Sequence, residues 1–407
     1  MKVLAILYPP RLDVYSYLLA DKRMEYEVLW HENEQEFQRA GYQLPAGLSA
    51  QHFWLNFSTP KKLLKEIKPD RIVFMEIIDQ RQIALIASAK KMGIPTFYLE
   101  HGSAGDRDTA LRRQGYSESK RDAAAAFIKL FSSFSKVVKV KLFYYSNFNA
   151  FASPSNRCSY MKLPLLMLRH APNQALCSCI FPERVPQKSI VFNRSNFREY
   201  QLYTGISENE AVFTGVPFFD NYYRKESLEK DHIIYIEHPM LESGLLEWDH
   251  EHHRKISGLL FGLAEERKIK IYVKLHPKSN ISLWTHLMNR SEYFEVLQQG
   301  DYTDLYLSSR LIFGYSSSLL VGLLCAKKNI VNIGWHPVPQ IFGSDFSKHG
   351  VCHKSMKPED IHTELDNWMS SNLCLDNKTG YEKFIFEFNY PFDGRAAERV
   401  TECIVNA

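Results

Sequence analysis

A histidine stands at the end of a short apolar stretch in the second half of the chain. The segment "IYVKLHPKSN" covers 271–280, and its first residues alternate as in a half-buried strand. His276 follows this strand, Lys274 and Lys278 flank it, and Pro277 keeps the strand from continuing. An imidazole N–H and two ammonium groups are suited to bind phosphate oxygens. The pattern predicts a phosphate site at this strand end; the alternative is a histidine that only ends the strand.

A serine cluster follows a second apolar stretch, in "FGYSSSLLVG". Gly314 permits a tight turn there, and Ser316, Ser317 and Ser318 open the next helix. The unpaired N–H groups and the dipole of a helix N-terminus attract anions, and serine hydroxyls add donors. The alternative is ordinary capping of the helix by serine. Since the cluster lies 40 residues after His276, again at a strand end, we expect both segments to bind one phosphate group.

The first half of the chain offers a candidate base in "YLEHGSAGD". Glu100 and His101 come directly after an apolar strand, and either side chain could accept a proton from a hydroxyl group. The alternative is a capping pair at a strand-to-helix turn. Asp79 and Asp106 are weaker candidates, and Glu76 is expected inside the preceding strand.

Two further segments are candidates for donor binding. "FTGVPFFD" contains Gly215 at the point where the chain is expected to turn toward the second half, and "IEHPM" places Glu237 at another strand end. Glu237 could reach a nucleotide base or ribose. The histidine-rich "DHEHHRK" is expected to be an exposed helix start, so we predict no metal site there.

The composition is that of a globular protein. Of its 407 residues 45% are hydrophobic and 24% charged, and a chain of this length favours two domains. Its longest apolar runs fall short of the roughly 18 residues that indicate a membrane span. Seven cysteines, an odd number at irregular spacing, argue against a disulfide framework and favour a reducing compartment.

Positive charge gathers in one part of the chain. Residues 107–170 contain 12 Lys or Arg and 3 Asp or Glu, a balance of +9, so the remainder carries 4 − 9 = −5. Many aromatic residues lie in the same block. This mixture suits an anionic membrane surface or a polyanionic acceptor. The alternative is an exposed basic face on helices whose aromatic residues fill a core. Nothing indicates a nucleic-acid partner.

Short apolar runs alternate with helical patterns through both halves of the chain. This rhythm predicts an α/β protein with two doubly wound, Rossmann-like parallel sheets facing a central cleft. The expected domains are 1–205, with the basic aromatic block as an insert at about 107–170, then 206–385, and a terminal helical segment at 386–407.

The order of these motifs resembles that of a known group of enzymes. "EHG", "FTGVPFFD", "VKLHP", "GYSSSLL" and "FDGRAAERV" are similar to motifs of the metal-independent GT-B glycosyltransferases of bacterial surface polysaccharides. The most similar groups are the bacterial sialyl- and polysialyltransferases and the CDP-glycerol glycerophosphotransferases. The resemblance extends from about residue 95 to 400 through short motifs, and it does not cover the basic block.

The resemblance implies a function and roles for single residues. His276 and Pro277 would bind the cytidine monophosphate part of the donor, Ser316 and Ser317 its phosphate, and Glu100 or His101 would be the base. The sialyltransferases have an acidic pair before the glycine where this chain has Glu100 and His101, which leaves base and donor open. The first domain would bind the acceptor and the second the nucleotide donor.

The implied reaction moves a nonulosonate sugar, such as sialic acid or Kdo, from a CMP donor to a glycan or glycolipid of the bacterial surface. A metal ion or another cofactor is not expected. The expected location is the cytoplasm, with the inner face of the cytoplasmic membrane as a candidate docking surface. Alternatives are a CDP-glycerol-type glycerophosphotransferase, a nucleotide-sugar 2-epimerase, and a non-enzymatic binding protein on the same fold.

Overall fold

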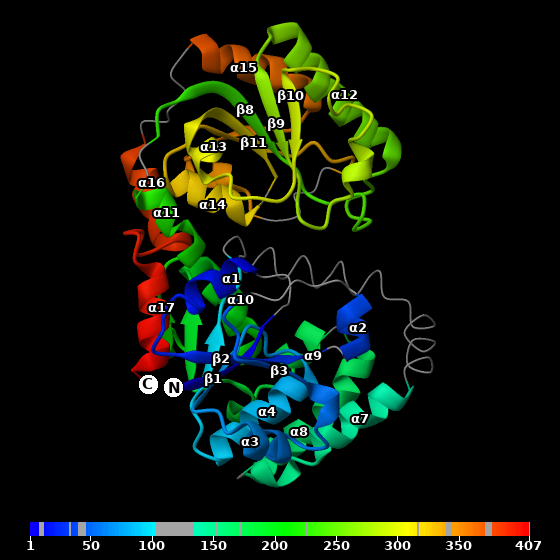
Figure 1. Ribbon diagram of the computed structural model, residues 1–407, viewed down its shortest axis with the longest axis vertical. Helices are drawn as coiled ribbons and strands as arrows, with labels where there is room; N and C mark the ends of the chain where they lie inside the picture. Colours follow the sequence, from blue (N-terminus) through cyan, green and yellow to red (C-terminus); the bar gives the residue numbers. More distant parts are fainter. Residues whose placement is uncertain are drawn as a thin grey trace. The chain divides into compact units, whose positions relative to one another are not determined.

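The chain forms two compact units, each built around its own parallel sheet (Figure 1). The computed structural model describes residues 1–7, 12–31, 34–39, 46–102, 134–151, 153–170, 172–224, 227–315, 317–338, 344–370 and 377–406. The first unit holds the described residues up to Phe218 and those from Arg395 onward, and the second unit holds Phe219–Gly394. The two sheets confirm the predicted α/β class with two doubly wound domains.

The first sheet has a strand order that creates a binding edge. Its strands are β1 (Lys2–Ile6), β2 (Glu25–Trp30), β3 (Ala50–Phe53), β4 (Arg71–Phe74), β5 (Thr96–Leu99), β6 (Lys188–Val191) and β7 (Ala211–Phe213). They pair in parallel in the order β3-β2-β1-β4-β5-β6-β7. Because the order reverses between β1 and β4, the carboxyl ends of these strands form the switch point where open α/β sheets bind ligands.

Helices connect and cover these strands. The first unit contains α1 (Leu12–Leu18), α2 (Glu34–Arg39), α3 (Pro60–Ile67), α4 (Gln80–Lys91), α7 (Phe134–Tyr145), α8 (Pro154–Arg169), α9 (Pro172–Cys177), α10 (Arg194–Thr204) and α17 (Ala396–Val405). The loop after β4 is held by a capping box, in which Asp79 accepts from the first turn of α4 and Gln82 accepts from the Asp79 N–H. This cap fixes where the β4–α4 loop leaves the sheet.

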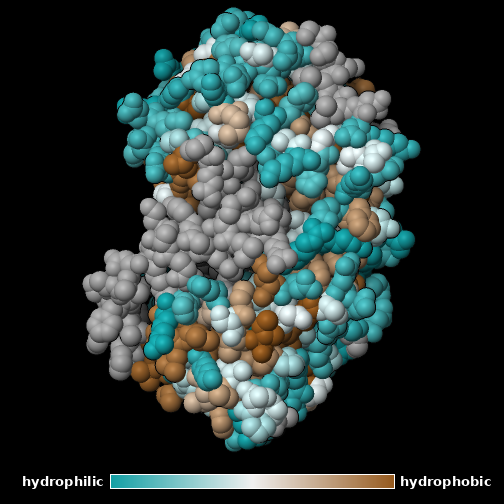
Figure 2. Space-filling view, turned by 180° about the vertical axis from the view of Figure 1, so that it is seen from behind, coloured by the Kyte–Doolittle hydropathy of each residue, from teal (hydrophilic) through white to brown (hydrophobic). Residues whose placement is uncertain are grey.

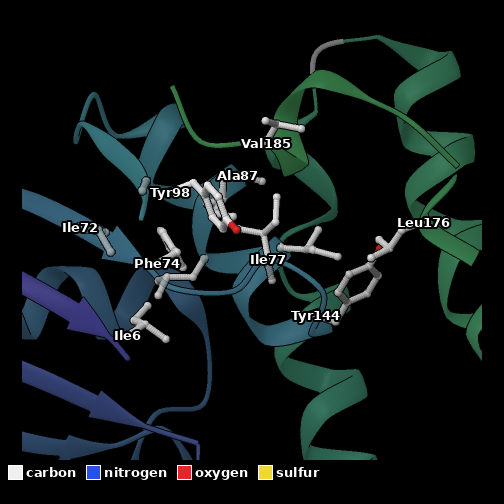
Figure 3. Close-up of a cluster of buried hydrophobic side chains, with 14 of the residues drawn as sticks. Ile6, Ile72, Phe74, Ile77, Ala87, Tyr98, Tyr144, Leu176 and Val185 are labelled. Atoms are coloured by element: carbon white, nitrogen blue, oxygen red, sulfur yellow. The ribbon is translucent and has the colours of Figure 1, made fainter. Parts of the chain in front are cut away.

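The core of the first unit lies between the sheet and helices from distant parts of the chain. Ile6, Phe74 and Tyr98 come from β1, β4 and β5 and belong to one buried cluster (Figure 3). Tyr144 of α7 and Leu176 of α9 belong to the same cluster. The described part of the predicted basic insert therefore contributes to the core of the first unit.

The aromatic residues of this insert divide between the interior and the surface. Phe143, Tyr144 and Phe151 are buried, whereas Phe148 is exposed. The rings of Tyr144 and Tyr160 stack at 3.8 Å between centroids and join α7 to α8. The buried aromatic residues thus belong to the core, which agrees with that part of the alternative interpretation of this block, and residues 107–133 lie outside the described part of the chain.

The second sheet repeats the same plan. Its strands are β8 (Lys230–Ile236), β9 (Lys270–Lys274), β10 (Phe294–Leu297), β11 (Ser309–Gly314), β12 (Ile330–Ile333) and β13 (His353–Ser355), in the parallel order β10-β9-β8-β11-β12-β13. Its helices are α11 (Asp220–Arg224), α12 (His250–Arg267), α13 (Thr303–Ser308), α14 (Ser318–Cys325), α15 (Ile361–Ser370) and α16 (Lys378–Phe388). The strand order reverses between β8 and β11, which defines a second switch point. No helix in the described segments is long and apolar enough to cross a membrane.

The observed division differs from the predicted one in two places. The boundary was expected at 205/206, but β7 extends the first sheet and the first unit continues through Phe218. The terminal segment was expected at 386–407, but α16 ends at Phe388 and α17 returns to the first unit, beside α1 (Figure 1). Hydrogen bonds hold α17 there, with Arg399 Nε donating to the carbonyl oxygen of Thr214 at 2.8 Å.

One glycine lets α14 approach the segment that opens the second unit. A Cβ placed on Gly322 would stand 2.4 Å from a ring carbon of Phe219, which is itself buried. Gly258 and Gly262 of α12 have no atom within 4 Å of such a Cβ. The glycine in α14 is therefore needed for packing, whereas those in α12 are not.

We expect Gly322→Ala to destabilise the second unit by about 1–3 kcal/mol, because the added methyl group overpacks against the Phe219 ring. Gly258→Ala is the matched control, and it should stabilise by about 0.4–1 kcal/mol by restricting the unfolded chain. Urea unfolding measures both. Equal effects of the two substitutions would contradict the close packing.

Candidate functional site

Three neighbouring strands of the second sheet end in one row. Lys274 of β9 and Gly314 of β11 are both register partners of Ile236 of β8. The loops that leave this row carry His276, Glu237 and the serine cluster. The structure thus places the two predicted phosphate-binding segments at the ends of β9 and β11, the strands on either side of β8, beside the switch point of the second sheet.

The His276 ring is held in one tautomer. The backbone N–H of Lys278 donates to Nδ1 of His276 at 3.1 Å, so Nδ1 carries no proton in this arrangement. Burial lowers the pKa of His276, and the charges of Lys278 and Lys274 lower it further. The ring is therefore neutral near pH 7 with its proton on Nε2, and this N–H can donate to an anion.

Glu237 supports the loop that carries the histidine. The hydroxyl group of Ser279 donates to Oε2 of Glu237, and the His276 N–H donates to the same oxygen at 3.4 Å. Burial raises the pKa of Glu237 to about 7. The sequence suggested that this carboxylate contacts a base or ribose, but in the structure it faces its own protein and positions the loop.

Lys274 is also engaged by the protein itself. Its Nζ donates to the carbonyl oxygens of Leu275 at 2.8 Å and Gln298 at 2.7 Å, and burial lowers its pKa. These bonds connect the end of β9 with the loop after β10, while Pro277 and Lys278 are exposed. An ammonium group has three N–H donors. Lys274 therefore uses two of them for these carbonyl oxygens and has one left.

The serine cluster opens α14 after β11. Ser317 is the N-cap, and its Oγ accepts from the N–H of Leu319 at 3.3 Å. The hydroxyl hydrogen is not used in this bond and can still be donated. Ser318 is the first residue of α14, and Ser316 lies outside the described residues. Ser317 therefore caps α14 in the ordinary way, and this role is compatible with anion binding.

In the first unit, Glu100 follows β5 and is 7% exposed. The hydroxyl of Tyr98 donates to Oε1 at 3.3 Å, whereas Oε2 is buried without a hydrogen bond in the described part of the chain. Burial, with a smaller effect of the Glu199 charge, raises the pKa of Glu100 to about 8. His101 is half-buried beside it. Most Glu100 carboxyl groups are therefore protonated at neutral pH.

The loop after Glu100 is tied to the start of α10. Nδ2 of Asn196 donates to the carbonyl oxygen of Gly102 at 2.5 Å. Asn193 caps this helix by accepting from the N–H of Asn196. The candidate base pair therefore stands on a fixed turn.

Four other candidates remain, three of them in the described part of the first unit. Gly215 belongs to the first unit, after β7, and its φ of 75° explains the choice of glycine there. Glu76 lies beyond the end of β4 at Phe74, so the expectation that it stands inside the strand was wrong. Asp79 binds Arg81, and although burial opposes it, the hydrogen bond from Arg81 lowers the pKa of Asp79 to about 2. Asp106 lies outside the described residues.

The expectation of a metal-free site is not tested by the structure. In the segments that the structure describes, no group of three or more His, Cys, Asp and Glu side chains is arranged to hold a metal ion. The sequence reasoning overlooked one Asp-x-Asp arrangement, Asp106 and Asp108, which lies in 103–133, outside those segments.

The chain is similar to a known family in sequence and to several solved structures in fold. The model of the alpha-2,8-polysialyltransferase (POLYST) family matches residues 26–300. No curated protein matches the chain. Among solved structures, the wall teichoic acid polymerase TagF has a TM-score of 0.52 and 12% identity, covering 100% of this chain and 88% of that chain.

Two epimerase structures are similar as well. The UDP-GlcNAc 2-epimerase of Methanocaldococcus jannaschii, in complex with UDP-GlcNAc and UDP, has a TM-score of 0.50 and 12% identity, covering 100% of both chains. A putative UDP-N-acetylglucosamine 2-epimerase from Listeria monocytogenes has a TM-score of 0.50 and 11% identity, covering 98% of this chain and 94% of that chain. At such identities the likeness shows the fold alone, and it confirms the predicted GT-B class.

Glu100→Gln should change stability in a pH-dependent way. A folded-state pKa of about 8 lies above the unfolded value of about 4.3, so ionisation of Glu100 costs nothing below pH 4 and its full amount above pH 8. The glutamine of the variant cannot ionise. The free energy of unfolding of the variant, relative to the parent, should therefore rise as the pH increases between these limits, by at most about 1.4 kcal/mol per pH unit. Thermal unfolding at pH 5, 7 and 9 measures this. A stability difference that does not vary with pH would contradict it.

Proposed function

Because the chain belongs to the alpha-2,8-polysialyltransferase family and is a glycosyltransferase, we propose that it transfers a nonulosonate sugar from a cytidine monophosphate donor. Sialic acid and Kdo are the candidate sugars, and the acceptor is a hydroxyl group of a glycan or glycolipid of a bacterial surface. The observation that carries this proposal is the row of loops at the ends of β9, β8 and β11, which presents hydrogen-bond donors at one switch point.

The donor phosphate would bind at this row. His276 offers Nε2–H, since Nδ1 is occupied by the Lys278 N–H. Ser317 offers its hydroxyl hydrogen, and the first N–H groups of α14 add a partial positive charge. Lys274 has one N–H beyond the two it gives to carbonyl oxygens. These groups would stabilise the negative charge that develops on the leaving phosphate.

The other residues that were predicted to bind the nucleotide donor have less direct roles in this proposal. Pro277 is exposed next to His276 and would line the nucleotide. Ser316 and Ser318 stand beside Ser317 in the serine cluster. Glu237 would act through the loop it holds, and Gly215 would shape the turn after β7.

The acceptor would be activated from the first unit. In the reaction the acceptor oxygen forms a bond to the anomeric carbon of the sugar, the bond from that carbon to the phosphate oxygen breaks, and CMP leaves with the electron pair. The acceptor proton passes to Glu100 or His101. Glu100 requires deprotonation before it can accept this proton, because its pKa is about 8.

The alternatives differ in the donor that they use and in whether they release a nucleotide from it. A CDP-glycerol-type glycerophosphotransferase would release CMP from CDP-glycerol, and the fold likeness to TagF keeps this reaction as a second candidate. A nucleotide-sugar 2-epimerase would invert C2 of the sugar of UDP-N-acetylglucosamine, with the epimer either still bound to UDP or released together with UDP, and the family match favours the transferase over this reaction. A binding protein would release no nucleotide. Incubation with CMP-sialic acid, CMP-Kdo, CDP-glycerol and UDP-N-acetylglucosamine separates these reactions.

His276→Ala should reduce CMP release at least tenfold without a large change in thermal stability, because the Nε2–H donor is lost. His276→Gln should retain more activity than His276→Asn, since a glutamine amide nitrogen reaches the place of Nε2 and an asparagine nitrogen the place of Nδ1. His286→Ala, at an exposed position in the same unit, is the control. Turnover that is unchanged in His276→Ala would remove this residue from the site.

The surface of α7 and α8 supports a membrane as a further partner. Large apolar side chains are exposed there at helical spacing, with Leu142 four residues after Val138 and Leu168 seven after Met161. Leu165 of the same row is 60% exposed. In the space-filling view, hydrophobic side chains gather on the lower part of the first unit (Figure 2). Such a face is unusual for a surface that stays in water.

The charges of these two helices complement an anionic bilayer. Both helices contain basic residues and no Asp or Glu. Lys139, Lys162 and Arg169 are exposed, whereas Lys136 is paired with Glu36 and Lys141 donates to Gln80. Anionic lipids attract such basic residues by about 1 kcal/mol each near the surface. We therefore propose that the α7–α8 face lies on an anionic membrane, where a lipid-linked acceptor would be found.

The protein should float with vesicles of phosphatidylcholine and phosphatidylglycerol and not with phosphatidylcholine alone. Replacing Leu142, Leu165 and Leu168 together by Ser should weaken this partitioning at least tenfold, because three anchors are lost. Leu228→Ser with Met369→Ser removes exposed apolar side chains of the second unit and should have no such effect. Equal binding to both vesicle types, or a dimer in solution that the triple variant abolishes, would contradict a membrane role.

A further inference from the structure

The loop after β8 contains a second His-Pro segment, His238-Pro239, to which the reaction described above gives no role. In the second sheet β8 lies between β9 and β11 (Figure 1). Its loop therefore leaves the sheet between the two loops that are assigned to the donor phosphate. An anion that contacts His276 on one side and Ser317 on the other has to pass the end of β8, where His238 stands.

His238 and His276 occupy equivalent positions on neighbouring strands. Ile236 of β8 and Lys274 of β9 are register partners, and each histidine stands two residues further on. Both histidines are half-buried. The centroids of the two imidazole rings are 6.1 Å apart, and the ring planes are inclined by 59°. The two rings therefore lie side by side at the carboxyl ends of adjacent strands.

The backbone turns in a similar way after both histidines. The carbonyl oxygen of His238 accepts from the N–H of Met240 at 2.7 Å, and that of His276 accepts from the N–H of Ser279 at 2.9 Å. A proline follows each histidine, which stops the strand and restricts the backbone of the residue before it. The position of each imidazole thus depends on a stiff turn rather than on a flexible loop.

Two carboxylates fasten the loop after β8 to the loop after β9. Glu237 accepts from the hydroxyl group of Ser279 and from the N–H of His276. Glu242, further along the same loop, accepts from the N–H of Asn280 at 2.5 Å. Since both carboxylates of one loop bind donors of the other, the two loops form one unit that holds the imidazole rings at their observed separation.

The groups around the two rings favour an anionic ligand. Lys278 is exposed beside His276, and Lys274 keeps one N–H beyond the two that it gives to carbonyl oxygens. A hydrogen bond from a ring N–H to a charged acceptor is roughly twice as strong as one between neutral groups. A phosphate group has several acceptor oxygens and can accept from two imidazole rings at once.

We propose that His238 is a second binding residue for the donor phosphate, and that His238 and His276 hold this phosphate between them. The inference rests on the proposed function, in which the second unit binds a cytidine monophosphate donor, and it adds a contact from the loop after β8. Both ring N–H groups would bind more strongly as negative charge develops on the leaving phosphate.

NMR of the histidine rings in the ¹⁵N-labelled full chain tests this pair, with CMP, cytidine and inorganic phosphate as probes. CMP and inorganic phosphate should each shift the ring signals of both His238 and His276. Cytidine has the same base and ribose without the phosphate, so it should leave the two ring signals nearly unchanged.

His238→Ala should weaken CMP binding at least tenfold and cytidine binding less than twofold, because the lost contact is to the phosphate. His238→Asn and His238→Gln place an amide N–H near Nδ1 and Nε2, and one of them should recover part of the CMP affinity. His286→Ala, at an exposed position of the same unit, is the control and should bind CMP as the parent does.

Two results would overturn the inference. One is a CMP titration that shifts His276 alone, with CMP affinity unchanged in His238→Ala. The other is a loss of cytidine binding in His238→Ala that is as large as the loss of CMP binding, since it would give His238 a purely structural role. If His238→Ala does not fold, the ring shifts of the parent protein decide.

The same titrations separate this inference from the proposed function. CMP that binds no more tightly than inorganic phosphate would refute the cytidine monophosphate donor. If inorganic phosphate still shifted both rings, the phosphate site formed by the two histidines would stand.

Discussion

The hydrogen bond from the Lys278 N–H to Nδ1 of His276 decides what this imidazole offers to a ligand. Because a backbone N–H can only donate, Nδ1 must accept, and the ring proton is left on Nε2. The nearby lysines and burial keep the ring neutral. A weakly basic ring with one fixed N–H is a directional donor to phosphate, and the proposed donor site depends on it.

The rest of the second-unit site keeps this loop in place. Glu237 binds the His276 N–H and the Ser279 hydroxyl, and Lys274 binds carbonyl oxygens at the ends of β9 and β10. Buried charges are costly unless such partners are present, which explains why both groups are used inside the protein. In the first unit Arg81 and Asp79 are likewise paired with each other.

Much of the fold could be predicted because buried parallel strands have sequences of short apolar runs. The loops after β9 and β11 could be identified by His276 and Ser317. Other features depend on contacts that the sequence does not display. β3 is a short edge strand with polar residues, so no apolar run marks it. The direction of the Glu237 carboxylate depends on the neighbouring strand, and a cavity beside Glu76 is closed by helices far away in the chain.

The central claim is tested most directly by long-range ¹H–¹⁵N NMR of the His276 ring at pH 7.5, with and without CMP. The account predicts a neutral ring with its proton on Nε2 before addition, and a shift of the Nε2 signal when CMP binds. A ring that is protonated on Nδ1 in the free protein, or an Nε2 signal that does not respond to saturating CMP, would contradict it.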